Sequence, residues 1–139
     1  MIKVFLDSNV LISALIGSAH SAPVVLVDWL ASGPATELTT GRCCIQEVER
    51  NLARKLTQAQ PLWHQFVNAS GIHIVPCPRK PITGVNAKDA AVVAAAVSAS
   101  ATYFVTGEKR LLAEMRAAKS KLPLALTPRE MLELLLTQR

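Results

Sequence analysis

Several short runs of this chain consist of consecutive apolar residues. In a strand with one exposed face, apolar and polar residues would alternate instead. Residues 4–6 and 103–105 are the clearest of these runs, and they predict strands that are buried on both faces. Residues 37–39, 72–75 and 124–126 are predicted to form three further strands. Strands buried on both faces are typical of a parallel sheet that is covered by helices.

The segments between these strands carry the spacing and the start signals of helices. Ser21 is a predicted N-cap with Pro23 in the first turn, and Asn86 is a predicted cap for an alanine-rich helix. Residues 127–130, Thr-Pro-Arg-Glu, have the pattern of a capping box. Helices are predicted from near residue 10, over 24–30, from 40 or 41 to 56, over 61–68, 87–99 and 108–117, and after 127. Strands that alternate with helices predict an α/β fold, a doubly wound parallel sheet in a single domain spanning 1–139.

The composition adds a weak indication about partners. Half of the residues are hydrophobic and only 4% are aromatic, so the chain has few aromatic platforms on which bases could stack. The formal charge is +5 and the pI is near 9.5. This basic character points only weakly to a polyanionic partner, because a basic protein need not have one.

The cysteines and the N-terminus bear on the compartment. The three cysteines, two of them adjacent at 43 and 44, match neither a disulfide framework nor a zinc-site spacing, so we expect reduced thiols. The N-terminus has a lysine and an early Asp7 where a signal peptide would be apolar, and no apolar run reaches the roughly 18 residues of a membrane span. We expect a soluble cytoplasmic protein that does not bind a membrane.

The segment from Asp7 to Asn9 follows the first predicted strand directly. In open parallel sheets, ligands bind in the crevice beyond the carboxyl ends of the strands, so a carboxylate at this place is a candidate for function. Asp, Ser and Asn are also the preferred N-cap residues, and capping of the next helix is an equally good interpretation.

Four carboxylates form the chemical candidate: Asp7 and Glu108 follow predicted strands, and Asp89 and Glu47 lie on predicted helices. Each alone also fits a capping, dipole or solvent-exposed role. If the two strands are neighbours, however, the acids meet in one crevice, where they repel unless a cation lies between them. Mg²⁺ or Mn²⁺ suits such oxygen ligands, and two ions about 4 Å apart can cleave a phosphodiester. The scattered His20, His64 and His73 are not needed for this chemistry.

Four segments of the chain resemble the PIN domain family: FLDSNVLISAL, IQEVERNL, KDAAVVAAAVSASATYFVTGEKRLL, and the capped helix after LALTP. The family consists of metal-dependent ribonucleases and includes the VapC-like toxins of type II toxin-antitoxin pairs. The resemblance implies a three-layer sandwich with a parallel, roughly five-stranded sheet between helices. It also implies catalytic and metal-binding roles for Asp7, Glu47, Asp89 and Glu108, with Asn9 and Thr106 as supporting polar residues.

Two positions depart from the family pattern, and one choice rests on the resemblance alone. Glu108 stands where the family usually has Asp, and Arg110 stands where many members have a further Asp. Arg110 either lowers metal affinity or contacts the substrate phosphate. Glu47 and Glu49 point about 200° apart on a helix. The helical spacing of the apolar residues in this segment places Glu49 nearer to the buried face of the helix. The choice of Glu47 therefore comes from the resemblance.

Cations next to the acidic residues are candidates for contacts with substrate phosphates: Lys88, Lys109 and Arg110. The predicted helix from residue 40 or 41 to 56 carries further cations that could contact the substrate phosphates, although charged helix faces usually only face solvent. They are Arg42, Arg50, Arg54 and Lys55.

Three functional hypotheses follow. The first is a Mg²⁺- or Mn²⁺-dependent endoribonuclease, the toxin of a type II toxin-antitoxin pair, with RNA as substrate, an antitoxin as partner and, by the resemblance, a homodimeric state. The second is a non-catalytic PIN-like module that binds RNA or protein, which Glu108 and Arg110 favour. The third, an aspartyl-phosphate phosphohydrolase, ranks last because Asn9 stands where a second acid is typically needed.

Overall fold

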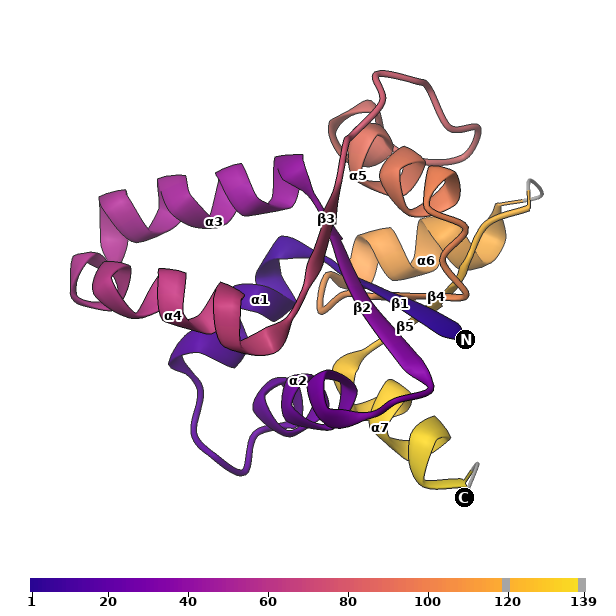
Figure 1. The fold of residues 1–139 in the computed structure, drawn as a ribbon. Coiled ribbons are helices and arrows are strands. Elements are labelled where there is room, and N and C mark those ends of the chain that lie inside the picture. Colours follow the sequence, from indigo (N-terminus) through magenta and orange to yellow (C-terminus); the bar gives the residue numbers. More distant parts are fainter. Residues whose placement is uncertain (119–120, 138–139) are drawn as a thin grey trace.

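A five-stranded parallel sheet forms the centre of the molecule in the computed structural model, which describes residues 1–118 and 121–137 (Figure 1). The strand order is β3-β2-β1-β4-β5. The strands are β1 (Ile2–Leu6), β2 (Thr36–Gly41), β3 (His73–Val75), β4 (Tyr103–Val105) and β5 (Leu124–Leu126). The predicted α/β class and parallel sheet are confirmed.

Within the described residues, seven α-helices and one short 3₁₀-helix connect and cover the strands. They are α1 (Ser8–Ile16), α2 (Ala22–Ser32), α3 (Arg42–Lys55), η1 (Thr57–Ala59), α4 (Gln60–Ser70), α5 (Ala87–Ser98), α6 (Lys109–Ala117) and α7 (Pro128–Thr137). Five predicted helix starts were misplaced by one or two residues, namely those of α1, α2, α3, α4 and α6. The first helix begins at Ser8, because Asp7 and not Ser8 or Asn9 is its N-cap, and α6 begins at Lys109 with Glu108 as its N-cap.

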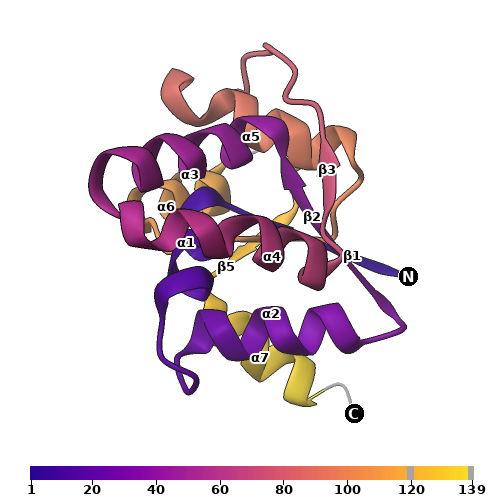
Figure 2. The ribbon, with the colours of Figure 1, turned by 60° about the vertical axis from the view of Figure 1, so that its left-hand side comes forward.

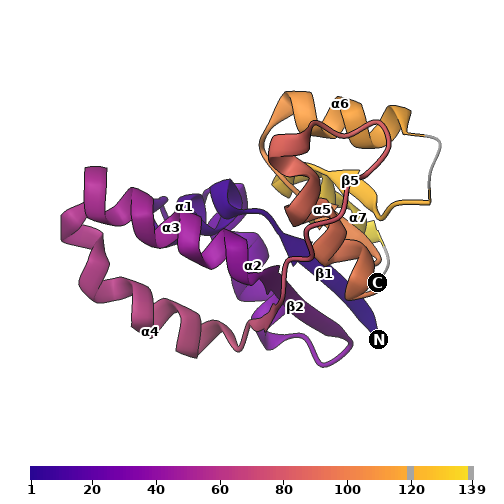
Figure 3. The same cartoon turned by 90° about the horizontal axis from the view of Figure 1, so that it is seen from above.

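The helices lie in layers around the sheet. α5 and α6 lie on one side of the strands and α2 and α7 on the other, so the sheet is the middle layer (Figures 1 and 2). α3 and α4 pack on each other as an antiparallel pair that extends beyond the sheet (Figure 3). Because β1 and β4 are neighbours, the turns that follow them lie next to each other at the carboxyl edge.

The core explains why the apolar runs are continuous. Val4, Phe5 and Leu6 of β1 are completely buried, as are Phe104 and Val105 of β4. The rings of Phe5 and Phe104 stack with their centroids 5.4 Å apart across the two strands. A central strand with helices on both sides has no solvent-facing side, and the buried positions of β1 and β4 are accordingly apolar, whereas β2 buries Thr39 and Thr40.

The predicted caps at Asn86 and Thr127 are confirmed. The Asn86 side chain accepts a hydrogen bond of 2.9 Å from the backbone N–H of Lys88. In the capping box, the Glu130 N–H donates to Thr127 Oγ1 at 3.1 Å, and the Thr127 N–H donates to Glu130 Oε1 at 2.9 Å. The hydrogen bond from the Thr127 N–H lowers the pKa of Glu130, and the hydrogen bond from Arg116 adds to this effect.

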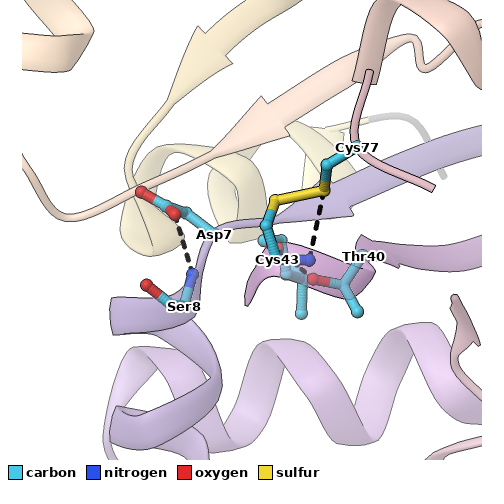
Figure 4. The surroundings of a disulfide bond; sticks show 6 residues. Asp7, Ser8, Thr40, Cys43 and Cys77 are labelled. Atoms are coloured by element: carbon cyan, nitrogen blue, oxygen red, sulfur yellow. Dashed lines mark hydrogen bonds between the residues drawn. A yellow bond between two sulfur atoms is a disulfide. The ribbon is translucent and has the colours of Figure 1, made fainter. Parts of the chain in front are cut away.

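The expectation of reduced cysteines was wrong for Cys43 and Cys77, which form a disulfide (Figure 4). Parallel strands explain the pairing. Gly41 of β2 is opposite Val75 of β3, and each cysteine stands two residues further along its own chain segment. Gly41 is required here, because a Cβ on it would lie only 2.6 Å from Cys77 Sγ. Since the two cysteines are 34 residues apart, only the strand register brings them together.

Cys44 is the free, buried thiol of the chain. Burial, reinforced by the nearby Asp7 carboxylate, raises the pKa of Cys44 to about 12, so the thiol stays protonated and unreactive. Among the helices of the described residues, none has both the length and the apolar character needed to cross a membrane.

Candidate active site

Asp7 and Thr106 each come directly after the last residue of a strand, and those strands are paired, with Leu6 opposite Val105. The Thr106 hydroxyl donates a hydrogen bond of 2.8 Å to Asp7 Oδ2. Asn9 Nδ2 donates to the same oxygen at 3.0 Å and to Thr106 Oγ1 at 3.1 Å. The two predicted supporting residues therefore both touch the Asp7 carboxylate and fix its orientation.

The backbone of the β4–α6 turn completes this network. The N–H of Gly107 donates to Asn9 Oδ1 at 2.8 Å, and the N–H of Glu108 donates to Thr106 Oγ1 at 3.1 Å. The other oxygen of Asp7, Oδ1, accepts from the Ser8 N–H at 2.8 Å, which is the helix cap. The Asp7 side chain thus caps α1, and the same hydrogen-bond network fixes the orientation of its carboxylate.

The Asp7 carboxyl is only 6% exposed, and its burial raises its pKa above the ordinary value. The hydrogen bonds from Thr106 and Ser8 act in the opposite direction, and the carboxylates of Glu47 and Asp89 raise the pKa further. The carboxylates are therefore close enough to repel one another, which is the situation that a bound cation relieves.

A cleft of about 750 Å³ contains all four predicted carboxylates. Its walls come from α1, α3, α5 and the β4–α6 turn. The lining residues are Asp7, Ser8, Asn9, Ile12, Ser13, Glu47, Arg50, Asn51, Lys88, Asp89, Val92, Gly107 and Glu108. α3 contributes Glu47, and α5 contributes Asp89 from its first turn. Segments that are more than 100 residues apart in the sequence thus form one acidic cleft at the carboxyl edge of the sheet.

The structure separates the two rival glutamates of α3. Glu47 lines the cleft, whereas Glu49 faces α4 and accepts a hydrogen bond of 3.3 Å from Trp63 Nε1. α3 packs against both the sheet and α4, so its most apolar side is not the side that faces the cleft. Periodicity alone pointed toward Glu49 for this reason.

Arg110 is the cation most closely associated with the acidic residues. Its Nη2 lies 3.2 Å from Asp89 Oδ2 and 3.3 Å from Glu108 Oε1, and its Nε lies 3.8 Å from Glu114 Oε2. No sequence motif points to Glu114, although its position four residues after Arg110 on a helix is the spacing of an ion pair.

The other predicted cations differ in position. Lys88 lines the cleft beside Asp89, whereas Lys109 is exposed and is not among the lining residues. Arg50 of α3 lines the cleft as well, and Arg42, Arg54 and Lys55 are exposed on the same helix. His20, His64 and His73 all lie outside the cleft lining.

The donor atoms in the cleft are carboxylate oxygens, which are the ligands that a hard divalent cation requires. As placed, no three acidic, histidine or cysteine side chains of residues 1–118 and 121–137 converge closely enough to ligate one ion. The carboxylates of Asp89 and Glu108 are instead drawn to Arg110. Asp7 and Glu47 fit a cation in chemistry and in their shared cleft, whereas Asp89 and Glu108 are both paired with Arg110.

A comparison with protein families gives a match to the PIN domain over residues 3–110. The chain belongs to the PIN domain family. The matched segment includes all four cleft carboxylates together with Asn9, Thr106 and Arg110. PIN domains are generally nucleases, and the family is generally dependent on divalent metal ions.

Solved structures provide a comparison for the fold of this PIN domain. It is similar to a chain in the crystal structure of VapBC2 from Rickettsia felis bound to a DNA fragment from the promoter. The TM-score is 0.65 at 14% identity, over 91% of this chain and 98% of the other. A comparison with curated protein sequences gave no match. At this identity the likeness concerns the fold, and the family assignment rests on the match over residues 3–110.

Proposed function

We propose that this PIN domain is a Mg²⁺- or Mn²⁺-dependent endoribonuclease. The observation that carries the proposal is the meeting of Asp7, Glu47, Asp89 and Glu108 in one cleft at the carboxyl edge of the sheet. Family membership supports a nuclease in general. RNA as the substrate is our inference from the resemblance and from the net charge of +5.

The chain's own residues have distinct roles in this proposal. Asp7 and Glu47 hold the cation, Asp89 and Glu108 lie in the same cleft and pair with Arg110, and Thr106 and Asn9 keep the Asp7 carboxylate oriented through their hydrogen bonds. A divalent cation, when bound, supplies an activated water and stabilises charge on the phosphate oxygens. Lys88 and Arg50 line the same cleft and attract the RNA backbone on either side of the cleaved bond.

We further propose that the protein is the toxin of a toxin-antitoxin pair and that it forms a homodimer. The similarity in fold to a chain of the VapBC2 structure and the family resemblance support this biological role. An antitoxin would be a second protein that binds the cleft side and blocks RNA. Growth arrest on induction of the gene, relieved by co-expression of a neighbouring gene product, tests the role, and light scattering tests the dimer.

Cleavage of a labelled structured RNA tests the enzymatic part. We expect cleavage with Mn²⁺ or Mg²⁺, loss of cleavage in EDTA, and recovery when the metal is restored. The same reactions at increasing salt are expected to slow, because phosphate contacts release counterions.

A non-catalytic binding module is the second candidate, and the pairing of Arg110 with Asp89 and Glu108 favours it. An intramolecular cation of this kind neutralises acids that a metal would otherwise use. Retention of RNA in a binding assay, without cleavage in any metal, would support this candidate and refute the nuclease.

A further inference from the structure

The guanidinium of Arg110 lies among three carboxylates that come from two helices and a turn. It approaches Asp89 of α5 at 3.2 Å, Glu108 of the β4–α6 turn at 3.3 Å, and Glu114 of α6 at 3.8 Å. Two of these, Asp89 and Glu108, belong to the four carboxylates of the cleft. The guanidinium therefore fills the space between two of the acidic residues from which a metal site would be built.

Arg110 is held in place from its far side. Glu114 Oε2 contacts Arg110 Nε, while Glu114 Oε1 accepts a hydrogen bond of 3.0 Å from the backbone N–H of Asn86. Asn86 is the N-cap of α5, the helix that carries Asp89. Glu114 thus links Arg110 to the start of the helix that carries its main partner, which makes the position of the guanidinium a built feature of the cleft.

The carboxylates differ in how fully they are engaged. The Asp89 side chain is 13% exposed and Glu108 is 39% exposed, so the contact with Asp89 is the more protected one. Among the ion pairs of the described residues, none includes Glu47, and Asp7 accepts hydrogen bonds only from neutral donors. Among the described residues, Asp89 and Glu108 thus have an ion-pair partner in Arg110, whereas Asp7 and Glu47 have none.

On the basis of the proposed metal-dependent function, we propose that Arg110 takes the place of a second divalent cation. The cleft then binds one Mg²⁺ or Mn²⁺ ion on the side of Asp7 and Glu47, with the Arg110 guanidinium between Asp89 and Glu108. An arginine is charged at every pH that proteins tolerate, so a second divalent ion next to it is strongly disfavoured. The guanidinium also has N–H donors that suit a phosphate oxygen, and its pairing with Asp89 and Glu108 does not require a metal.

Counting the bound ions tests this inference directly. Mn²⁺ is titrated into the metal-free full chain and followed by calorimetry and by the EPR signal of free Mn²⁺. Arg110→Ala removes the guanidinium, and Arg129→Ala is the matched control, because Arg129 is exposed on α7 outside the cleft and the charge change is the same. Circular dichroism and the melting temperature verify that each variant is folded.

We expect one Mn²⁺ ion per chain in the wild type and in Arg129→Ala, and two in Arg110→Ala. Two ions in the wild type, or one ion in Arg110→Ala, would overturn the inference. No ion in any of the proteins would overturn both this inference and the metal-dependent function. Expected ion counts without RNA cleavage by the wild type would refute the nuclease and leave the role of Arg110 in place.

Discussion

The hydroxyl of Thr106 donates a 2.8 Å hydrogen bond to Oδ2 of Asp7, although the two residues are 99 positions apart in the sequence. The contact exists because β1 and β4 are adjacent and end in register, with Leu6 opposite Val105. A buried carboxylate is oriented in this way by the turn after the neighbouring strand. The pairing of these two strands thus positions the carboxylate on which the proposed chemistry depends.

Thr106→Val keeps the side-chain shape and removes the hydroxyl that Asp7, Asn9 and Glu108 all contact. Loss of a partner that orients a metal ligand typically costs about 10–100-fold in metal affinity or activity, and we expect a loss in this range. Mn²⁺ affinity and the rate of RNA cleavage measure it. Thr106→Ser retains the hydroxyl and is the control, so equal behaviour of the Val and Ser variants would contradict the assigned role.

The two glutamates of α3 are predicted to differ in function. Glu47→Gln removes a carboxylate from the cleft and is expected to lower RNA cleavage at least about tenfold, in line with the loss of a charged group that acts in the transition state. Glu49→Gln is the matched control, because Glu49 contacts Trp63 and not the cleft. Kinetics of both variants at saturating Mn²⁺ measure the difference. A larger loss in Glu49→Gln would contradict the placement of Glu47.

The pKa of Asp7 predicts how stability depends on pH. Its folded-state pKa is raised by burial first, so between the unfolded and the folded values the folded protein binds more protons than the unfolded chain. In EDTA, the contribution of Asp7 to the free energy of unfolding is therefore present at low pH and is lost as the pH rises through the folded-state pKa.

Urea unfolding at a series of pH values, for wild type and Asp7→Asn in EDTA, measures this contribution. We expect the stability of the wild type relative to Asp7→Asn to fall as the pH rises. Saturating Mn²⁺ is expected to reverse the trend, because the ion binds the ionised carboxylate. An unchanged difference between the two proteins across the pH series would contradict the shifted pKa.

The Cys43–Cys77 disulfide is predicted to stabilise the fold. It closes a loop of 34 residues, and the chain-entropy estimate for such a loop is about 4 kcal/mol. Urea unfolding of the wild type with and without reductant measures the effect, and Cys77→Ser is the control that reductant should not change. Alkylation of the denatured, unreduced protein is expected to label one thiol, Cys44; three labelled thiols would contradict the disulfide.

Much of the fold could be predicted because its signals are local. A strand with helices on both sides can be apolar on both of its faces, and this made residues 4–6 and 103–105 recognisable, although β2 instead buries Thr39 and Thr40. Caps are equally local, since Asn86 and Thr127 bond to backbone groups within three residues. The one-residue shift at Glu108 arose because a helix N-cap is a matter of backbone geometry more than of residue type.

The details of the site depend on packing and register, which local patterns do not contain. The pairing of Arg110 with Asp89 requires the first turns of α5 and α6 to lie close together, and the residues are 21 positions apart. The disulfide requires the register of β2 on β3. The direction of Glu47 depends on α3 packing against α4 through Glu49 and Trp63. In each of these cases the decisive partner belongs to another element.

The central claim is that the carboxylates of the cleft carry metal-dependent cleavage of RNA. Its most direct test is cleavage of a labelled structured RNA in Mn²⁺ by the wild type, Asp7→Asn and Asp89→Asn side by side, after each is shown to be folded. We predict cleavage by the wild type and its loss in both variants. Cleavage that persists in both variants, or its absence from the wild type on several RNAs together with no Mn²⁺-induced rise in melting temperature, would contradict the claim.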